Sequence, residues 1–196
     1  MQVNFNEEKH IYSIKEHIIP SVTQIISEII GYPFYASEWH MNRGRVVHKC
    51  AELIAHGKTF TWDEQVDGYV KAIFRFFDEV KPKVKFVEKI VYSKVYDFAG
   101  TIDLVAQIGN WNFILDYKNS FSKDQLGLQL AAYTIALWET EKIRVVWNAG
   151  VELSNTGNYK LHRINENYPG KYEKEFLALR TVYGIKQRNN LLTKGE

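Results

Sequence analysis

The stretch from Gly100 to Ser120, which reads GTIDLVAQIGNWNFILDYKNS, restricts the fold of this chain more than any other. Two apolar, β-rich runs, residues 101–107 and 111–118, flank the pair Gly109-Asn110. A Gly-Asn pair between such runs is typical of a tight antiparallel hairpin. The stretch therefore predicts two long antiparallel strands joined by a two-residue turn.

The register of this hairpin sets two carboxylates against each other. Counting outwards from the turn, Asp103 lies opposite Asp116, and Thr101 lies opposite Lys118. Opposed residues share a face of the sheet with Cβ atoms about 5 Å apart, so both aspartates and Lys118 project together. Two carboxylates at that separation repel by roughly 3 kcal/mol at an effective dielectric of about 20. A divalent cation between them would remove this cost; alternatively, the face is a solvated acidic surface, or Lys118 neutralises the pair.

Composition excludes several classes of function. The 196 residues suit one domain, and the net charge of +2 permits a polyanionic partner without indicating one. The single cysteine, Cys50, excludes an internal disulfide, a four-cysteine zinc site and an iron–sulfur cluster. Residues 57–59 read Gly-Lys-Thr, but Glu52 stands where a phosphate-binding loop needs its first glycine. Because no signal peptide or membrane-spanning run is visible, we expect a cytoplasmic protein without membrane contact.

Outside the hairpin, apolar periodicity and chain-breaking residues predict the remaining elements. The predicted strands are 2–6, 11–14, 85–92, 143–151 and 159–164, and the predicted helices are 20–31, 37–56, 63–80, 124–138 and 169–189. The inward residues of the second helix are Val47, Cys50, Ala51 and Ile54, and those of the third are Val66, Val70, Ile73, Phe74 and Phe77. The order of elements predicts an α/β (mixed α+β) fold, with a mixed sheet, made of an antiparallel meander and a crossover strand, flanked by helices.

Three more residues can reach the carboxylate pair. His48 lies beside the core stripe of its helix, with Arg45 and Glu52 on the same side, and imidazole is a good ligand for Mn²⁺ and a tolerable one for Mg²⁺. A lone helical histidine is otherwise a surface or core residue. Glu88 shares the face of Asp103 if the preceding turn is centred on Lys94-Val95, which would put Glu88 opposite Thr101. That turn carries no Gly, Pro or Asn signal, so an ordinary surface carboxylate is the alternative.

The helix at 124–138 is apolar nearly all round, yet it carries a polar stripe. Gln125, Gln129 and Tyr133 fall at intervals of four residues. A buried amide must be hydrogen-bonded. Gln129 therefore either bonds to backbone in the core or contacts Lys118 or a substrate phosphate.

These residues follow one another in a familiar order: His48, then Gly100-Thr-Ile-Asp103, then Asp116-Tyr-Lys118, then Gln129-Leu-Ala-Ala-Tyr133. The pattern resembles the PD-(D/E)XK nuclease superfamily, in its RecB-like exonuclease branch. It spans about half of the chain, and the N-terminal segment is similar to phage-encoded single-domain members. The chain departs from some relatives in lacking their cysteine set.

The resemblance implies a restriction-endonuclease-like core in one domain, 1–196. Within it, 1–35 would be an N-terminal hairpin and helix, 36–151 the catalytic core, and 152–196 a C-terminal strand and helix. It implies a metal-dependent DNA nuclease, in the first place an exonuclease acting on single- or double-stranded ends. A structure-specific or nicking endonuclease and a catalytically silent nucleic-acid-binding module are the alternatives. A homo-oligomer, or a recombination or repair partner protein, would be compatible with it.

The resemblance also assigns roles to individual residues. Asp103 and Asp116 would bind Mg²⁺ or Mn²⁺ with help from His48 and the backbone carbonyl of Tyr117, while Lys118 would orient or deprotonate the attacking water. Gln129 would steady Lys118 or the phosphate, and Tyr133 would line the path of the strand. The expected substrate-binding residues are Arg45, Glu52, Glu88, Ser120, Gln129 and Tyr133, with Arg43, Lys49 and Lys123 as further candidate phosphate contacts.

Overall fold

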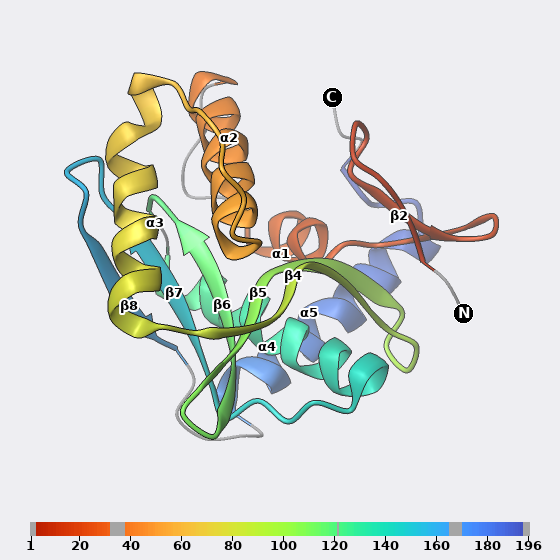
Figure 1. The fold of residues 1–196 in the computed structure, drawn as a ribbon. Helices are drawn as coiled ribbons and strands as arrows, with labels where there is room; N and C mark the ends of the chain where they lie inside the picture. The colour runs from red at the N-terminus through yellow and green to blue at the C-terminus, as the bar shows by residue number, and fades with distance from the viewer. Residues whose placement is uncertain (1–2, 32–37, 121, 165–169, 194–196) are drawn as a thin grey trace.

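A five-stranded mixed sheet forms the centre of the protein, as the computed structural model of residues 3–31, 38–120, 122–164 and 170–193 describes it (Figure 1). Its strands run in the order β4-β5-β6-β7-β8, and only the β6–β7 pair among them is parallel. Helix α4 (Lys123–Glu141) makes the connection that a parallel pair requires. The predicted meander, crossover strand and mixed fold class are therefore confirmed. The strands of this sheet are β4 (Lys83–Ser93), β5 (Phe98–Ile108), β6 (Trp111–Lys118), β7 (Trp147–Leu153) and β8 (Tyr159–Arg163).

Helices cover both faces of this sheet (Figure 1). They are α1 (Val22–Ile30), α2 (Glu38–Ala55), α3 (Asp67–Val80) with the 3₁₀ turn η1 (Glu64–Val66) before it, α4 (Lys123–Glu141) and α5 (Lys171–Arg188). One apolar core lies between the sheet and α1, α4 and α5, and a second lies between the sheet and α2 and α3. The inward stripe of α2 is confirmed. In α3 the prediction for Phe74 is wrong, because Phe74 is exposed while Phe76 is fully buried.

The hairpin of β5 and β6 has the predicted register. Ile108 pairs with Trp111, and the pairing continues without a shift to Leu104 and Leu115. Gly109 takes a left-handed φ of 59° in the two-residue turn, a conformation that glycine adopts without a steric penalty. Asp103 and Asp116 lie one position beyond the last paired residues.

The preceding hairpin, β4 to β5, has a different register from the predicted one. Its turn is four residues long, so Ser93 pairs with Phe98 and Ile90, not Glu88, pairs with Thr101. The shift is two residues, and because side chains alternate with a period of two, Glu88 keeps its expected face. Glu88 comes to lie at the level of Asp103, between the pairs Val87–Leu104 and Lys89–Ile102.

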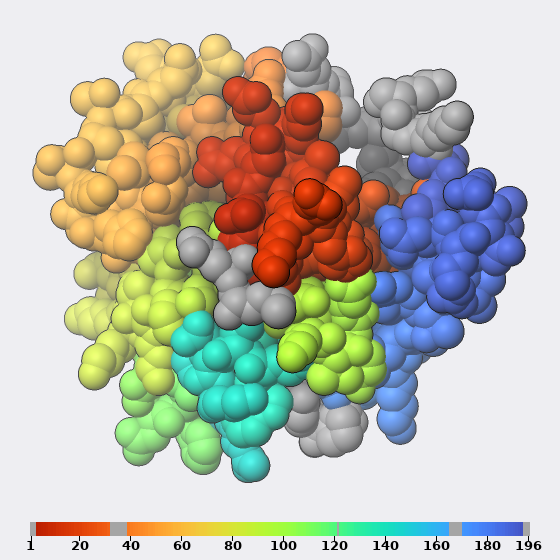
Figure 2. Space-filling view, turned by 90° about the vertical axis from the view of Figure 1, so that its right-hand side faces the viewer, coloured from red at the N-terminus to blue at the C-terminus, as the bar shows by residue number. Residues whose placement is uncertain are grey.

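The N-terminal residues form a separate small sheet that packs on the main one. It contains β1 (Asn4–Asn6), β2 (Ile11–Ile14) and a third strand, β3 (His17–Ile19), which the sequence analysis did not predict. Tyr12 and Ile19 pack with Ala99 of β5, and the Ala99 N–H donates to the Pro20 carbonyl at 3.1 Å. In Figure 2 this N-terminal part (red) occupies the middle of one face, beside α5 (blue).

Helix boundaries follow local chemistry where it is strong. Ser21 caps α1 in a capping box with Gln24, so the helix predicted at 20–31 begins at Val22. The strand predicted at 143–151 begins later, at Trp147, and the residue before it, Val146, donates its N–H to the carbonyl of Asn112 near the start of β6 at 3.0 Å. The predicted starts of strand 2–6, helix 37–56 and helix 169–189 lie outside the described residues.

Candidate active site

The site lies where β5 and β6 stop pairing. Beyond Leu104 the Asp103 carboxylate, not the backbone ladder, accepts the N–H of Tyr117, at 2.9 Å. A carboxylate that accepts a backbone N–H is held in a fixed orientation. Asp103 is only 7 % exposed and Asp116 only 1 %, but each contacts a more accessible partner, His48 or Lys118. The carboxylates are therefore buried, but against polar side chains that reach solvent and not in purely apolar packing.

Three potential metal ligands converge on this point from three different elements. His48 on α2, Glu88 on β4 and Asp103 on β5 place one ligand atom each within 4.8 Å of one another. The His48 Nδ1 atom lies 3.3 Å from Asp103 Oδ2. Two carboxylates and an imidazole make a donor set suited to Mg²⁺ or Mn²⁺. These residues form a candidate divalent-metal site.

Glu88 has an unusual backbone conformation for a residue within a strand. Its φ is +47°, in the left-handed region that costs a non-glycine residue about 1–3 kcal/mol. The strain falls at the position where β4 faces Asp103, and it directs a carboxylate into the cluster. Backbone strain of this kind concentrates at functional sites.

Asp116, on the β6 side of Asp103, is held by polar contacts. Lys118 Nζ lies 2.8 Å from Asp116 Oδ2, and the Gln129 amide nitrogen donates to Asp116 Oδ1 at 3.0 Å. The same Gln129 nitrogen donates to the Tyr133 hydroxyl at 3.0 Å. Of the alternatives for Gln129, these contacts correspond to neither backbone bonding nor a Lys118 contact: its amide holds the neighbouring carboxylate. Gly100 makes room for this arrangement, because a Cβ there would lie 2.5 Å from the Tyr133 ring.

The ionisation of the cluster reflects crowding of negative charge. Burial would lower the pKa of His48, but the Asp103 carboxylate outweighs it and raises that pKa to about 9. Burial, and then the Asp103 charge, raise the pKa of Glu88 to about 7. Burial also raises the pKa of Asp116, to about 6, against the opposing effect of Lys118. Although burial acts in the other direction, the His48 charge leaves the pKa of Asp103 below its ordinary value. The cluster thus carries more carboxylates than the nearby cations balance.

The other expected substrate-binding residues lie further from the carboxylates or are engaged elsewhere. Arg45 is exposed and donates to Asn42 at 3.3 Å, and Glu52 pairs with Lys49 at 2.6 Å. Ser120 is exposed just beyond β6, and Lys123 is exposed at the start of α4. Arg43 lies over the rings of Trp39 and Tyr69, at 4.6 and 5.1 Å.

One residue near the site escaped the sequence analysis. The Tyr12 hydroxyl lies 2.8 Å from the Thr101 hydroxyl. Burial, and to a smaller extent the charges of Glu88 and Asp103, raise the pKa of Tyr12 to about 12, so this side chain lies near the acidic cluster. The small N-terminal sheet therefore closes one side of the site. Nothing in the sequence around Tyr12 signals this contact, because its partner is 89 residues away.

Comparison with known proteins agrees with this geometry. The family model of the PD-(D/E)XK nuclease superfamily matches residues 58–182, well over half of the chain. The chain belongs to this superfamily. The match confirms the resemblance that the ordered motif indicates. No curated protein matches the chain.

Solved structures share the fold at low sequence identity. A provisionally named exonuclease from Eubacterium rectale is 11 % identical with a TM-score of 0.59, over 89 % of this chain and 83 % of that one. The alkaline exonuclease LHK-Exo of Laribacter hongkongensis is 10 % identical with a TM-score of 0.50, over 87 % and 88 % of the two chains. The same enzyme in complex with dAMP gives 13 % and 0.50, over 88 % and 89 %. Separately, none of the helices in the described part of the chain has the length and apolar character needed to cross a bilayer.

Proposed function

We propose that the protein is a metal-dependent DNA exonuclease that hydrolyses phosphodiester bonds with Mg²⁺ or Mn²⁺. The observation that carries the proposal is the convergence of an acidic cluster and a lysine at the end of the β5–β6 pairing. His48, Glu88 and Asp103 form one half of this constellation, and the Asp116–Lys118 ion pair forms the other. The exonucleases among the solved neighbours, one of them in complex with dAMP, support DNA as the substrate.

The residues present fit a divalent cation. Three carboxylates gather here, and His48 and Lys118 together supply fewer positive charges than Glu88, Asp103 and Asp116 supply negative ones at neutral pH. Glu88 and Asp103 would hold the cation with His48, and Asp116 would complete the set on the β6 side. A bound cation supplies Lewis-acid polarisation of the phosphoryl oxygen and activation of water.

The residues of the chain would supply orientation and proton handling. The Lys118 ammonium, held 2.8 Å from Asp116, can orient the attacking water and stabilise charge that develops on the phosphoryl oxygens. The Gln129 amide fixes the other oxygen of Asp116, so the carboxylate stays directed at Lys118. Water oxygen bonds to phosphorus as the bond from phosphorus to the leaving oxygen breaks, and a proton from water finally reaches that oxygen.

Two other functions share these residues. A structure-specific or nicking endonuclease would use the same chemistry on an internal bond. A catalytically silent nucleic-acid-binding module would need no cation, and such proteins usually lack an acidic ligand or the lysine, all of which are present here.

The test is digestion of end-labelled single- and double-stranded oligonucleotides and of a closed circular plasmid. Each reaction would be run with Mg²⁺, with Mn²⁺ and with chelator, beside the variant Asp116→Asn. We expect the linear substrates to be shortened from an end only with metal, the circle to stay intact, and the variant to be inactive. Cleavage of the circle would support an endonuclease, and no cleavage of any substrate would support the silent module.

A further inference from the structure

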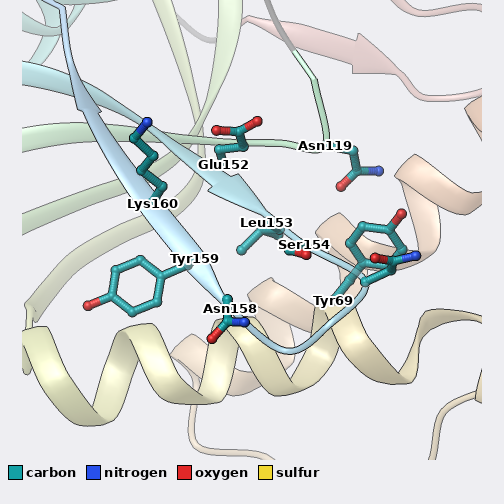
Figure 3. Close-up of a pocket in the computed structure, with 9 residues that line it drawn as sticks. Tyr69, Asn119, Glu152, Leu153, Ser154, Asn158, Tyr159 and Lys160 are labelled. Carbon is teal, nitrogen blue, oxygen red and sulfur yellow. The ribbon is translucent and has the colours of Figure 1, made fainter.

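A polar pocket of about 430 Å³ lies beside the candidate active site, between the ends of β6 and β7 and helix α3 (Figure 3). Asn119, in its wall, directly follows Lys118 in the chain. Glu152, also in its wall, is the strand partner of Lys118 across the parallel β6–β7 pair. The pocket therefore begins within about 5 Å of the Lys118 backbone. It opens at the carboxyl ends of two parallel strands, where α/β folds commonly bind ligands.

The chemistry of the wall favours a flat, polar and uncharged ligand. Amide side chains are contributed by Asn119, Asn155 and Asn158, and aromatic walls by Tyr69 and Tyr159. Within the described residues, the side-chain amides of Asn119 and Asn155 make no hydrogen bond to the protein, while Asn158 is held by Arg75 at 2.6 Å. An amide offers both donors and an acceptor, which match the edge of a nucleobase. The size is in the range of about 300–1,000 Å³ typical of small-ligand sites.

The charges of the wall argue against a phosphate as the occupant. Lys160, the one lysine or arginine in the lining, is the strand partner of Glu152, which brings a carboxylate to the same part of the wall. A phosphate site would show an excess of positive charge. Two guanidinium groups lie beside the wall. Arg75, which donates to Asn158 at 2.6 Å, is paired with Glu79 at 2.7 Å, so a carboxylate of the protein already balances its charge. Arg43 lies over the Tyr69 ring at 5.1 Å.

We propose that this pocket holds the base of a nucleotide adjoining the scissile phosphate. The proposal rests on the proposed nuclease function and extends it. Asn119 and Asn155 hydrogen-bond to the edge of the base, and the two tyrosines of the lining form the sides of the space for its ring. Because an amide can present either its oxygen or its nitrogen to a partner, the pocket accepts all four bases. It requires a base without selecting a sequence.

The test uses oligonucleotides with an abasic residue at each of the four positions nearest the cleaved bond, compared with intact DNA. For the wild-type protein we expect kcat/KM to fall about tenfold or more at one adjoining position, since a stacked and hydrogen-bonded base contributes about 1–3 kcal/mol. The double variant Asn119→Ala/Asn155→Ala should cleave intact DNA more slowly and lose the abasic penalty. Exchange of the base among A, C, G and T should change the rate by only a few-fold.

Two controls keep the outcome interpretable. Asn4→Ala, at an exposed position on β1, should behave as wild type. Neither Asn119 nor Asn155 has a positive φ, so alanine is compatible with both backbones, and the single variants serve if the double variant melts early. If an abasic residue does not lower kcat/KM of the wild type, or lowers it equally in the variants, the pocket does not bind a base, and the proposed nuclease function is unaffected.

If the wild-type protein cleaves no DNA, the proposed function fails, and equilibrium binding still decides on the pocket. Fluorescence anisotropy with the same labelled oligonucleotides in chelator measures this directly. Weaker binding of one abasic oligonucleotide by the wild type, with the difference lost in the double variant, would support the base site. Equal affinities for intact and abasic DNA would refute it.

Discussion

Two acidic residues of the β4–β5 hairpin share a strained backbone conformation but sit in opposite surroundings. Glu88 has a φ of +47° and Asp97 a φ of +52°. For a non-glycine residue this conformation persists only where the surroundings stabilise it. The groups around each carboxylate therefore indicate whether the strained residue has a structural or a functional role.

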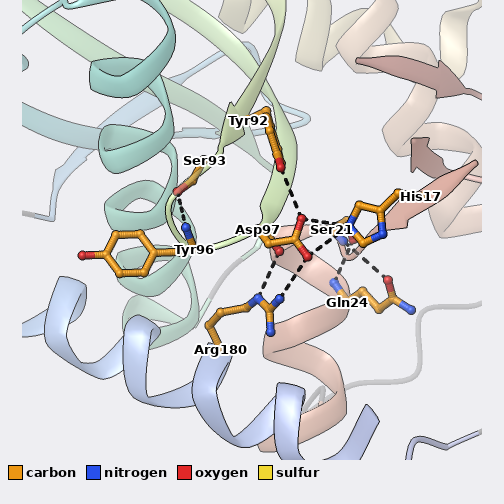
Figure 4. Close-up of polar contacts among 8 residues, drawn as sticks. All are labelled: His17, Ser21, Gln24, Tyr92, Ser93, Tyr96, Asp97 and Arg180. Carbon is orange, nitrogen blue, oxygen red and sulfur yellow. Dashed lines mark hydrogen bonds and ion pairs between the residues drawn. The ribbon is translucent and has the colours of Figure 1, made fainter. Parts of the chain in front are cut away.

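The side chain and the backbone carbonyl of Asp97 both contact polar groups of the protein (Figure 4). Its carboxylate lies 3.0 Å from His17 Nε2 and 3.4 Å from Arg180 Nη2, and it accepts from the Tyr92 hydroxyl at 3.3 Å. Its backbone carbonyl accepts from Arg180 Nε at 3.1 Å. These contacts join β3, the β4–β5 turn and α5, so the residue fastens the N-terminal sheet and the last helix to the main sheet.

Glu88, in contrast, faces the Asp103 carboxylate as well as the His48 imidazole. The charge of Asp103 adds to the effect of burial in raising its pKa to about 7. The His48 charge lowers this pKa in part, but among the described residues no ion pair or hydrogen bond to the Glu88 carboxylate offsets the strain as the Arg180 and His17 contacts do at Asp97. The difference shows how to separate a structural acid from a functional one: the structural acid has its counter-charge within the fold, and the functional acid is left to take it from a ligand.

The largest effect should come from replacing Lys118 with Met. The side chain lies beside Asp116, where charge is expected to develop during hydrolysis, so we expect kcat to fall about a thousandfold. Lys118 lowers the pKa of Asp116, which burial has raised to about 6, so without this cation the pKa rises further, the carboxylate can take up a proton, and the fold should survive. Steady-state cleavage and thermal melting measure both quantities. Lys174→Met, which removes an exposed lysine of α5, is the matched control and should keep most of the activity.

Glu88→Gln should separate function from stability. Removing the Glu88 charge from the cluster relieves repulsion. At about pH 8, above the raised pKa of Glu88, the metal-free variant should therefore melt at a higher temperature than the wild type. The same change removes a potential ligand, so the variant should lose most of its cleavage activity and most of the stabilisation that millimolar Mg²⁺ or Mn²⁺ gives the wild type, which amounts to about 2.7 kcal/mol when the ion is at a hundred times its Kd. A variant that melts below the wild type and keeps its metal response would show that Glu88 is a structural acid like Asp97.

The same contrast explains which parts of the site could be read from the sequence. Asp103, Asp116 and Lys118 were predictable because the Gly109-Asn110 turn sets a register with a period of two, and the confirmed pairing runs to Leu104. The position of Glu88 along β4 relative to β5 was not predictable, because the turn before β5 contains no Gly, Pro or Asn that would fix its length. Asp97 in this turn is held by His17 and Arg180, which lie 80 and 83 residues away in the sequence.

The closure of the site by the N-terminal sheet could not be predicted for a similar reason. The Tyr12–Thr101 contact joins residues that local periodicity does not connect. The ligand role that we propose for Glu88 likewise depends on strain within β4, and backbone strain has no sequence signature in a strand of ordinary composition. The elements themselves, in contrast, follow from local patterns, apart from β3 and the late start of β7.

Asp97→Asn should give the reverse of the Glu88 result. Asparagine tolerates the left-handed conformation, so the variant loses the charge and little else. We expect the free energy of unfolding to fall by about 1–2 kcal/mol, because the ion pairs with Arg180 and His17 are partly exposed. The rate of cleavage per folded molecule should not change. Denaturant unfolding and cleavage below the melting transition measure the two effects, and a large loss of kcat at unchanged stability would contradict the assignment.

A third carboxylate, Glu28 on α1, provides a pH-dependent version of the comparison. Lys186 of α5 and Thr193 hydrogen-bond to it and lower its pKa from 4.5 to about 2. Because the folded pKa is the lower one, the contact stabilises the fold fully above about pH 4.5, and this contribution is lost as the pH falls towards about 2. Glu28→Gln should cost roughly 1 kcal/mol at pH 7 and should flatten the pH dependence of the free energy of unfolding between those values. Glu16→Gln, at an exposed position, is the control, and parallel pH profiles for wild type and Glu28→Gln would show that the α1–α5 contact is not electrostatic.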